Sequence, residues 1–392
     1  MSRPEVENWA YRADVAEQAI RNRHASALWG LPRTNLAVVS WPATPQHKAF
    51  FTWHYWWQAH YLECLVDAAQ RVPSREKYEA VRNTIRGIRI RNLSPLASNK
   101  YYDDRAWMVL ALGRVDSMHG KRKPRRQTQL LLQALTNGID STTGVLPWRE
   151  EELFYNVPSN GPAAIAFARA GRLDDACALV DWVFDNLVAD TGLLYDGIRL
   201  SMTGEEVQRG MYSYNQGVMI GACLEIALEL KNREQHGRAM EYLTRCQSLI
   251  HAVAVNMASS DHVIKGSGGG DGGLFNGVLI RYLADAAVRL PSDDHGSRAA
   301  ARIARRLVLA TGESAWNHRL EVDGLPLFPA NWEKDATFPQ GSGPVAASIA
   351  GAVRSSAVRE RDLSVQLSGW IVMEACARVA EDDERRKKAL EA

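Results

Sequence analysis

Apolar side chains recur along this chain mainly with the three-to-four-residue spacing of an amphipathic α-helix. The spacing predicts about twelve helices. They cover residues 5–27, 50–69, 75–91, 102–117, 125–137, 158–170, 173–188, 214–230, 234–257, 273–288, 295–310 and 362–380. Signals for strands are sparse, and only 262–265 and 319–322 are short candidates. The pattern therefore predicts an all-α protein.

The connections between these helices alternate between short and long. Gly171-Arg172 is a short one, in which a glycine ends one helix just before the next begins. The long ones, at 138–157, 189–213, 258–272 and 312–361, are rich in glycine, aromatic and acidic residues. An α-solenoid would show a sequence repeat, and we find none. The alternation favours an (α/α)6 toroid of six helical hairpins, formed by a single domain over 1–392 with its core at about 8–380.

The amino-acid composition gives no indication of a strongly charged partner. Lys and Arg (47) nearly balance Asp and Glu (45), and the basic run 121–126 (KRKPRR) is typical of a solvated connection, so we expect no nucleic-acid partner. The oligomeric state stays open. Five scattered cysteines within apolar runs indicate reduced, buried thiols.

The N-terminal residues carry charges where a signal peptide needs an apolar core. No stretch reaches the length of about 18 apolar residues that a membrane span requires. We therefore expect a cytoplasmic protein without a membrane span, with secretion as the alternative if an export signal has been removed.

Two adjacent acids stand where the helix at 102–117 begins. Asp103 and Asp104 follow Tyr101 and Tyr102, and Trp107 comes one turn later. A helix cap is the plain interpretation, since aspartate is common at helix starts. The alternative is an acid pair for glycosidic cleavage, because one carboxylic acid must protonate the leaving oxygen while a carboxylate attacks or activates water. Flat aromatic faces beside the pair would suit sugar rings.

Tryptophan is abundant, with twelve residues in the chain. A single large aromatic side chain is more often part of the core than a ligand platform. Trp148 and Trp332, however, fall in the long loops, where a sugar platform is an equal alternative.

Other motifs point away from competing chemistry. The glycine-rich stretch from Gly266 lacks the Lys-Ser/Thr of a phosphate-binding P-loop. His60 and Cys64 lie one helical turn apart, but no second pair at ligand spacing accompanies them. No HExxH, GxSxG or CxxC motif occurs. We expect no metal and no organic cofactor.

Read in order, several segments resemble glycoside hydrolase family 76, the α-1,6-mannanases. The likeness runs from about residue 8 to 380. The matching segments are Tyr102-Asp103-Asp104-Arg105-Ala106-Trp107, Tyr155-Asn156-Val157-Pro158-Ser159-Asn160, Gly192-Leu193-Leu194-Tyr195-Asp196-Gly197, Tyr212-Ser213-Tyr214-Asn215-Gln216-Gly217, Asp271-Gly272-Gly273-Leu274-Phe275-Asn276 and Phe328 with Trp332.

The resemblance implies an (α/α)6 toroid that hydrolyses α-1,6-linked mannose with retention of configuration. It makes Asp103 the nucleophile and Asp104 the general acid/base, an order that the residues alone do not give. The oligosaccharide or polysaccharide substrate would contact a set of cleft residues. These are Tyr101, Tyr102, Trp148, Asn156, Asn160, Tyr195, Asp196, Tyr214, Asn215, Gln216, Asp271 and Trp332.

Two departures from the family pattern concern the substrate. The family usually has lysine where Tyr155 stands and often lysine where Asn276 stands. Two other functions remain open. One is a sugar epimerase or uronyl hydrolase of the same architecture. The epimerase would need a basic pair, typically histidines, and His54 and His60, six residues apart, are less suitably placed for that. The other is a non-catalytic glycan-binding protein that keeps only the toroid.

Overall fold

The computed structural model describes residues 3–120, 125–266, 268–340, 347–349 and 352–391. These residues are mostly helical, and their strands are short. The chain divides into two compact units. The first unit consists of Met1–Leu93, Ala258–Ala284 and Ala304–Ala392, and the second of Ser94–Met257 and Asp285–Ile303. The single domain predicted over 1–392 stays a prediction, and Lys121 to Pro124 of the basic run lie outside the described residues.

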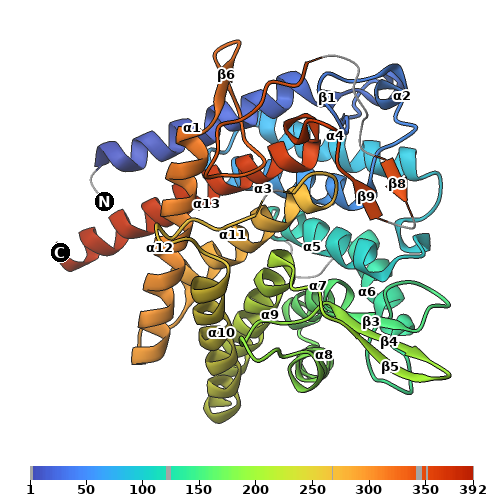
Figure 1. Ribbon diagram of the computed structural model, residues 1–392, viewed down its shortest axis with the longest axis vertical. Helices are drawn as coiled ribbons and strands as arrows, with labels where there is room; N and C mark the ends of the chain where they lie inside the picture. Colours follow the sequence, from blue (N-terminus) through green and yellow to red (C-terminus); the bar gives the residue numbers. More distant parts are fainter. Residues whose placement is uncertain (1–2, 121–124, 267, 341–346, 350–351, 392) are drawn as a thin grey trace. The chain divides into compact units, whose positions relative to one another are not determined.

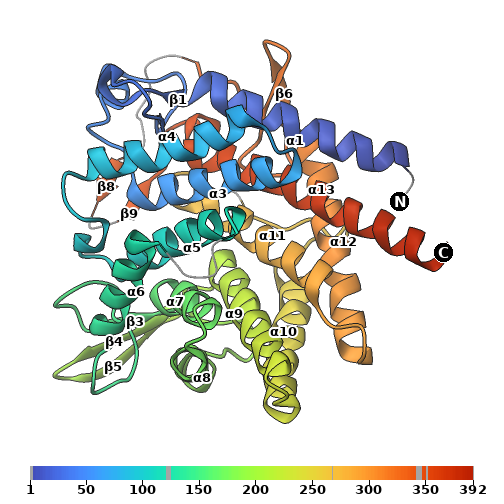
Figure 2. The same cartoon turned by 180° about the vertical axis from the view of Figure 1, so that it is seen from behind.

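The second unit is built from three consecutive helical hairpins (Figures 1 and 2). They are α5 (Tyr102–Met118) with α6 (Arg126–Gly138), α7 (Val157–Arg169) with α8 (Leu173–Asn186), and α9 (Ser213–Asn232) with α10 (His236–Asn256). The first helices of the hairpins, α5, α7 and α9, pack against one another in a row. Each of these three helices has buried apolar side chains on several of its faces, because it has neighbours on several sides. Helix α6 instead buries one face through Leu131 and Leu135 and exposes Leu130.

The first unit pairs the two ends of the chain. Helix α1 (Arg3–Arg23) runs antiparallel to α13 (Leu363–Glu391), and α13 packs on α3 (Tyr55–Arg71), which forms a hairpin with α4 (Arg75–Asn92) (Figure 1). Buried aromatic rings such as Tyr61 and Trp370 fill the space between α3 and α13. The remaining helices are α2 (Pro45–Lys48), α11 (Gly272–Arg289) and α12 (His295–Asn317).

All described strands are antiparallel and lie in the connections. They are β1 (Ala25–Ser26) with β2 (Leu36–Ala37), β3 (Phe154–Asn156) with β4 (Gly197–Ser201) and β5 (Gly204–Gln208), β6 (Leu320–Val322) with β7 (Leu325–Leu327), and β8 (Ala347–Ile349) with β9 (Ala352–Arg354). Short 3-10 turns occur at Leu28–Gly30, Leu96–Ser98 and Arg359–Arg361.

The twelve predicted helices are all present, and the four-residue α2 was missed. The helix predicted from residue 50 begins only at Tyr55, because Phe50 (φ 55°) and His54 (φ 46°) adopt left-handed backbone conformations. The strand predicted at 319–322 is confirmed by β6. The one predicted at 262–265 is wrong, since only Ile264 forms a β-bridge there. As expected, all five cysteines are buried and form no disulfide.

A recurring pair of hydrogen bonds links the connections to the helices. In four places a buried side-chain amide both donates to and accepts from the backbone of one residue in an earlier connection, at 2.8–3.0 Å. The pairs are Gln58 with Ala37, Asn160 with Leu146, Gln216 with Leu194, and Gln366 with Phe328. The helical hairpins therefore share a structural repeat that the sequence does not display.

Two of the long connections, 189–213 and 258–272, contain the same turn. Ala189 donates to Leu193 O at 2.8 Å, and at the equivalent position Ser259 donates to Val263 O at 2.8 Å. The residue before each acceptor has a left-handed backbone, which is glycine in the first turn (Gly192, φ 77°) and His262 (φ 64°) in the second. A Cβ atom is strained in this conformation and glycine is not.

Replacing His262 by glycine is therefore expected to raise the free energy of unfolding by about 0.5–1 kcal/mol. The side chain of His262 is exposed, so its removal costs little packing. Urea denaturation of the wild type and the variant measures the change. Gly192→Ala is the mirror experiment, with a loss of about 1 kcal/mol expected. A destabilised His262→Gly protein would show that the turn does not strain its left-handed residue.

Candidate active site

The neighbouring residues Asp103 and Asp104 lie in the first turn of α5, and both are half-buried. The N-cap of this helix is Tyr101, whose side chain makes no capping hydrogen bond. One carboxylate bonds within the turn, because Asp103 Oδ1 accepts the backbone N–H of Asp104 at 2.8 Å. Asp103 therefore accepts a backbone N–H of the first turn, as the helix-cap interpretation predicts. The N-cap residue itself, however, is Tyr101 and not an aspartate.

The indole of Trp148 fixes the other oxygen of the first carboxylate. Its Nε1 donates to Asp103 Oδ2 at 3.0 Å. The ring stands edge-on to Tyr101, with centroids 5.2 Å apart, and to Phe154, at 6.2 Å. The backbone adds to this, since Tyr102 N–H donates to Trp148 O at 2.9 Å. The loop tryptophan therefore lies beside the acid pair, and the sugar-platform role predicted for it stays a prediction.

A residue that the sequence analysis missed holds the second carboxylate. The amide Nδ2 of Asn99 donates to Asp104 Oδ2 at 2.7 Å, and its Oδ1 accepts the backbone N–H of Tyr101 at 3.0 Å. An asparagine that bonds to the backbone two residues later is a common turn motif. The spacing of Asn99 and Tyr101 could have revealed this turn, but nothing local indicated the bond to Asp104.

Three of the predicted cleft residues serve the fold through buried side chains. Asn156 is the N-cap of α7 and accepts the backbone N–H of Ser159 at 3.2 Å. Asn160 and Gln216 are two of the buried amides that bond to the backbone of an earlier connection. Each also donates to the carbonyl four residues earlier, Asn156 O at 2.9 Å and Tyr212 O at 3.1 Å. Contact of these side chains with substrate stays a prediction.

The half-buried Asp196 and the buried Asn215 form a hydrogen-bonded dyad at the start of α9. Asn215 Nδ2 donates to Asp196 Oδ1 at 2.9 Å, while the Oδ1 of Asn215 is buried without a hydrogen-bond partner among the described residues. Burial raises the pKa of Asp196 to about 6, and the amide of Asn215 offsets only part of this effect. Burial and the charge of Asp196 also raise the pKa of Tyr212. Asp196 is thus a further carboxylate in this unit, with a pKa raised to about 6.

The raised pKa of Asp196 predicts a pH-dependent effect on stability. An ionised Asp196 destabilises the folded protein above about pH 6, and this destabilisation disappears as pH falls towards 3.8, its ordinary pKa. Asp196→Asn should therefore raise the free energy of unfolding by about 1–3 kcal/mol at pH 7.5 and leave it almost unchanged at pH 4. Urea denaturation at both pH values measures this. An equal effect at both would contradict the assignment.

The remaining aromatic candidates in this unit differ in exposure. Tyr195 and Tyr214 are half-buried. The guanidinium of Arg209 lies 5.9 Å from the ring of Tyr195, and Tyr212 packs against Tyr214 at 6.1 Å. Tyr102 is only 8% exposed and is therefore part of the core.

Two candidates belong to the first unit. Asp271 accepts the indole N–H groups of Trp56 at 2.8 Å and Trp57 at 3.0 Å through Oδ1, and the Val353 N–H at 2.6 Å through Oδ2. Burial raises the pKa of Asp271, although these donors lower it. Trp332 is buried, 3% exposed, so the loop position did not make it an open platform.

The departures from the family pattern have local structural partners. Tyr155 is buried, and its hydroxyl donates to Asp140 Oδ2 at 2.7 Å. In the first unit Asn276 donates to Lys265 O at 3.1 Å. The tyrosine is therefore tied to a loop carboxylate.

The histidines and cysteine that could suggest other chemistry lie in the first unit. His60 is buried, with Nδ1 3.3 Å from Glu63, and burial lowers its pKa. Burial also lowers the pKa of His54 to about 4. Cys64 lies near the guanidinium of Arg281. Among the described residues no three His, Cys, Asp or Glu side chains gather as a metal site would require. No helix in the described part of the chain is long and apolar enough to cross a membrane.

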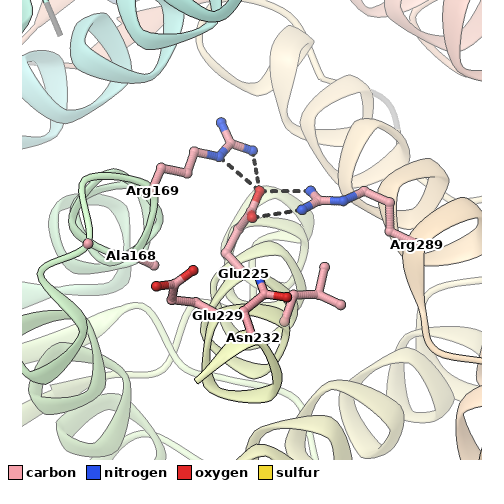
Figure 3. A pocket seen from close by; sticks show the side chains of 8 residues that line it. Ala168, Arg169, Glu225, Glu229, Asn232 and Arg289 are labelled. Carbon is pink, nitrogen blue, oxygen red and sulfur yellow. Dashed lines mark hydrogen bonds and ion pairs between the residues drawn. The ribbon is translucent and has the colours of Figure 1, made fainter. Parts of the chain in front are cut away.

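A cavity of about 200 Å³ lies at the C-terminal ends of α7 and α9 (Figure 3). Its central carboxylate, Glu225, accepts from both Arg169 and Arg289 at 2.6–2.8 Å. Burial raises the pKa of Glu225, but the two guanidinium groups outweigh burial and lower it. The predicted site residues lie instead at the N-terminal ends of these helices, so the cavity is not part of the candidate active site.

Comparison with known proteins gives a family and a fold. A family model described as glycosyl hydrolase family 76 matches residues 32–336. No curated protein matches the chain.

Solved structures match nearly the whole chain. The GH76A α-1,6-mannanase of Salegentibacter sp. HEL1_6 is 24% identical with a TM-score of 0.76, covering 95% of this chain and 99% of that one. An inactive variant of it, with two adjacent aspartates replaced by asparagine, is in complex with α-1,6-mannotriose (24%, TM-score 0.75, 95% and 99%). The Lin0763 protein of Listeria innocua is 24% identical with a TM-score of 0.74, covering 98% of each chain. The predicted fold class, an all-α (α/α)6 toroid, is thereby confirmed.

Proposed function

Since this chain belongs to glycosyl hydrolase family 76 and is a glycosidase, we propose that it cleaves α-1,6-linked mannose in mannan or in mannose-bearing glycoconjugates. The cut falls within the glycan chain and retains the anomeric configuration. The observation that carries this proposal is the adjacent pair Asp103 and Asp104 at the start of α5. In the Salegentibacter α-1,6-mannanase, an inactive variant has two adjacent aspartates replaced by asparagine.

The chain contains three further pairs of adjacent aspartates besides Asp103 and Asp104. In each of the other three pairs, a member is bound to a basic side chain. These contacts are Asp175 to Arg172, Asp293 to Lys231, and Asp382 to Arg305 and Arg386. The hydrogen-bond donors to Asp103 and Asp104 include the indole of Trp148 and the side-chain amide of Asn99. These donors orient a carboxylate without adding a full charge beside it.

The proposed reaction has two steps. Asp104 donates a proton to the glycosidic oxygen as the bond to C1 breaks, and a carboxylate oxygen of Asp103 forms a glycosyl ester at C1. In the second step the Asp104 carboxylate takes a proton from water, the water oxygen attacks C1, and Asp103 leaves as a carboxylate. The two inversions together retain the configuration.

Digestion of linear α-1,6-mannan, followed by proton NMR of the products as they form, tests linkage, cleavage and stereochemistry together. The expected first products are oligosaccharides with α-anomeric reducing ends, before mutarotation. A β-anomer appearing first would contradict retention, and free mannose appearing first would contradict internal cleavage. An epimer without bond cleavage, or binding without turnover, would contradict the proposed reaction.

A further inference from the structure

We propose that Asn99 and Trp148 are positioning residues, each of which orients one carboxylate of the pair for its proposed role, Asp104 as the acid/base and Asp103 as the nucleophile. Each donates one N–H to one carboxylate of the pair. The catalytic roles of the two aspartates rest on the proposed function. The hydrogen bonds from Asn99 and Trp148 are observed independently of that function.

The orientation of the Asn99 amide is determined by the backbone. Its Oδ1 accepts the N–H of Tyr101 at 3.0 Å, so Nδ2 is the end that faces Asp104, 2.7 Å from Oδ2. An amide N–H directed at Oδ2 disfavours a proton on that oxygen. When Asp104 is protonated, its proton is therefore favoured on Oδ1 over Oδ2.

The Asp103 carboxylate accepts N–H groups at both oxygens. The indole of Trp148 donates to Oδ2 at 3.0 Å, and the backbone N–H of Asp104 donates to Oδ1 at 2.8 Å. Two N–H donors and the positive end of a helix dipole favour an ionised carboxylate. An ionised carboxylate is what a nucleophile must be, so these donors suit Asp103 to the nucleophilic role.

Both positioning residues are held firmly relative to the pair. The segment before α5 and the segment after the long 139–147 loop pair as two short antiparallel stretches. Tyr101 forms a β-bridge with Arg149, and Glu150 N–H donates to Lys100 O at 2.9 Å. The donors therefore sit on paired backbone and not on a free loop end.

Two basic residues on the segments next to the pair have acidic partners. The segments 99–105 and 148–152 also contain the ionisable residues Lys100, Tyr101, Arg105, Arg149, Glu150, Glu151 and Glu152. Arg105 forms an ion pair with Glu150 and Arg149 with Glu152, and the guanidinium of Arg149 lies 5.9 Å from the Tyr101 ring. The beginning of α7, which packs on α5, has no ionisable side chain, and the C-terminal half of α6 has none either.

Replacing Asn99 by aspartate tests the first assignment. The new carboxylate can still accept the Tyr101 N–H, but it turns a donor to Asp104 into a like charge. We expect kcat on α-1,6-mannotetraose to fall about 100-fold. With 2,4-dinitrophenyl α-mannoside, whose leaving group needs no proton, a burst should persist at nearly the wild-type rate. Azide should restore turnover, because it needs no base. Asn186→Asp, an exposed site on α8, is the matched control.

Replacing Trp148 by phenylalanine tests the second. The ring packing against Tyr101 is kept and the N–H donor is lost, so kcat should fall about tenfold or more on both substrates while KM changes little. Azide should give no recovery, since the nucleophilic step itself is slowed. A rise in KM at constant kcat would overturn this assignment and favour a sugar platform.

A measurement without substrate separates this proposal from the proposed function. In protein with 13C-labelled aspartate carboxyls, the resonance missing from Asp104→Asn identifies Asp104. Its pKa should rise by about one unit or more in Asn99→Asp and stay unchanged in Asn186→Asp. An unchanged pKa of Asp104 in Asn99→Asp would overturn the role of Asn99 whatever glycan the enzyme cleaves. Failure of the wild type on mannan alone would refute only the proposed substrate.

Discussion

Asparagine in place of either Asp103 or Asp104 is expected to lower kcat for α-1,6-mannan cleavage by roughly 1,000-fold or more. Asparagine is nearly isosteric with aspartate, and it can accept the same N–H bonds from Trp148 or Asn99. The fold should therefore persist, and the lost activity reports the missing nucleophile or proton donor. Reducing-end assays on mannan, with circular dichroism to check folding, measure the result.

The two variants should differ in one respect. Azide should rescue Asp104→Asn with a 2,4-dinitrophenyl α-mannoside, because the nucleophile is still present, and it should not rescue Asp103→Asn. Asp174→Asn, in the adjacent-aspartate pair at the start of α8, is the matched control and should keep full activity. Wild-type activity in Asp103→Asn or Asp104→Asn would refute the assignment of the catalytic pair.

Methionine in place of Gln216 is expected to reduce the free energy of unfolding by about 3–5 kcal/mol. Methionine has nearly the same shape, but it cannot replace the three bonds of the amide. The Gln216 amide accepts the Leu194 N–H at 2.8 Å through Oε1, and it donates through Nε2 to Leu194 O at 2.9 Å and to Tyr212 O at 3.1 Å. The side chain is fully buried, so the backbone groups it leaves behind have no water to bond.

Urea denaturation measures this loss, and hydrogen exchange at the Leu194 amide locates it. The protection of that amide should fall more than the protection of amides within α10. Gln133→Met is the matched control, because Gln133 is exposed on α6 and its side chain donates to Asn137 in the same helix. A loss below about 1 kcal/mol would mean that the Gln216 amide contributes little net stability.

The helices and the acid pair could be predicted from the sequence because their signals are local. Apolar periodicity marks a helix wherever the helix packs. Asp103 and Asp104 stand at a helix start that the pattern itself places. The buried cysteines followed from the same apolar runs. The strands of the connections were mostly missed, since β3 and β4 pair residues about forty positions apart, and neither strand has a periodic pattern of its own.

The surroundings of the acid pair were decided by tertiary structure. Trp148 reaches Asp103 from 45 residues away, and the burial of Trp332 depends on what packs over its loop. The bonds of Gln216 to the backbone of Leu194 could not be predicted, because a backbone partner carries no side-chain signal. Sequence alone therefore determined where helices form and where two carboxylates meet a helix end. Only folding decided which donors those carboxylates accept from, because such bonds depend on distance in space and not on spacing along the chain.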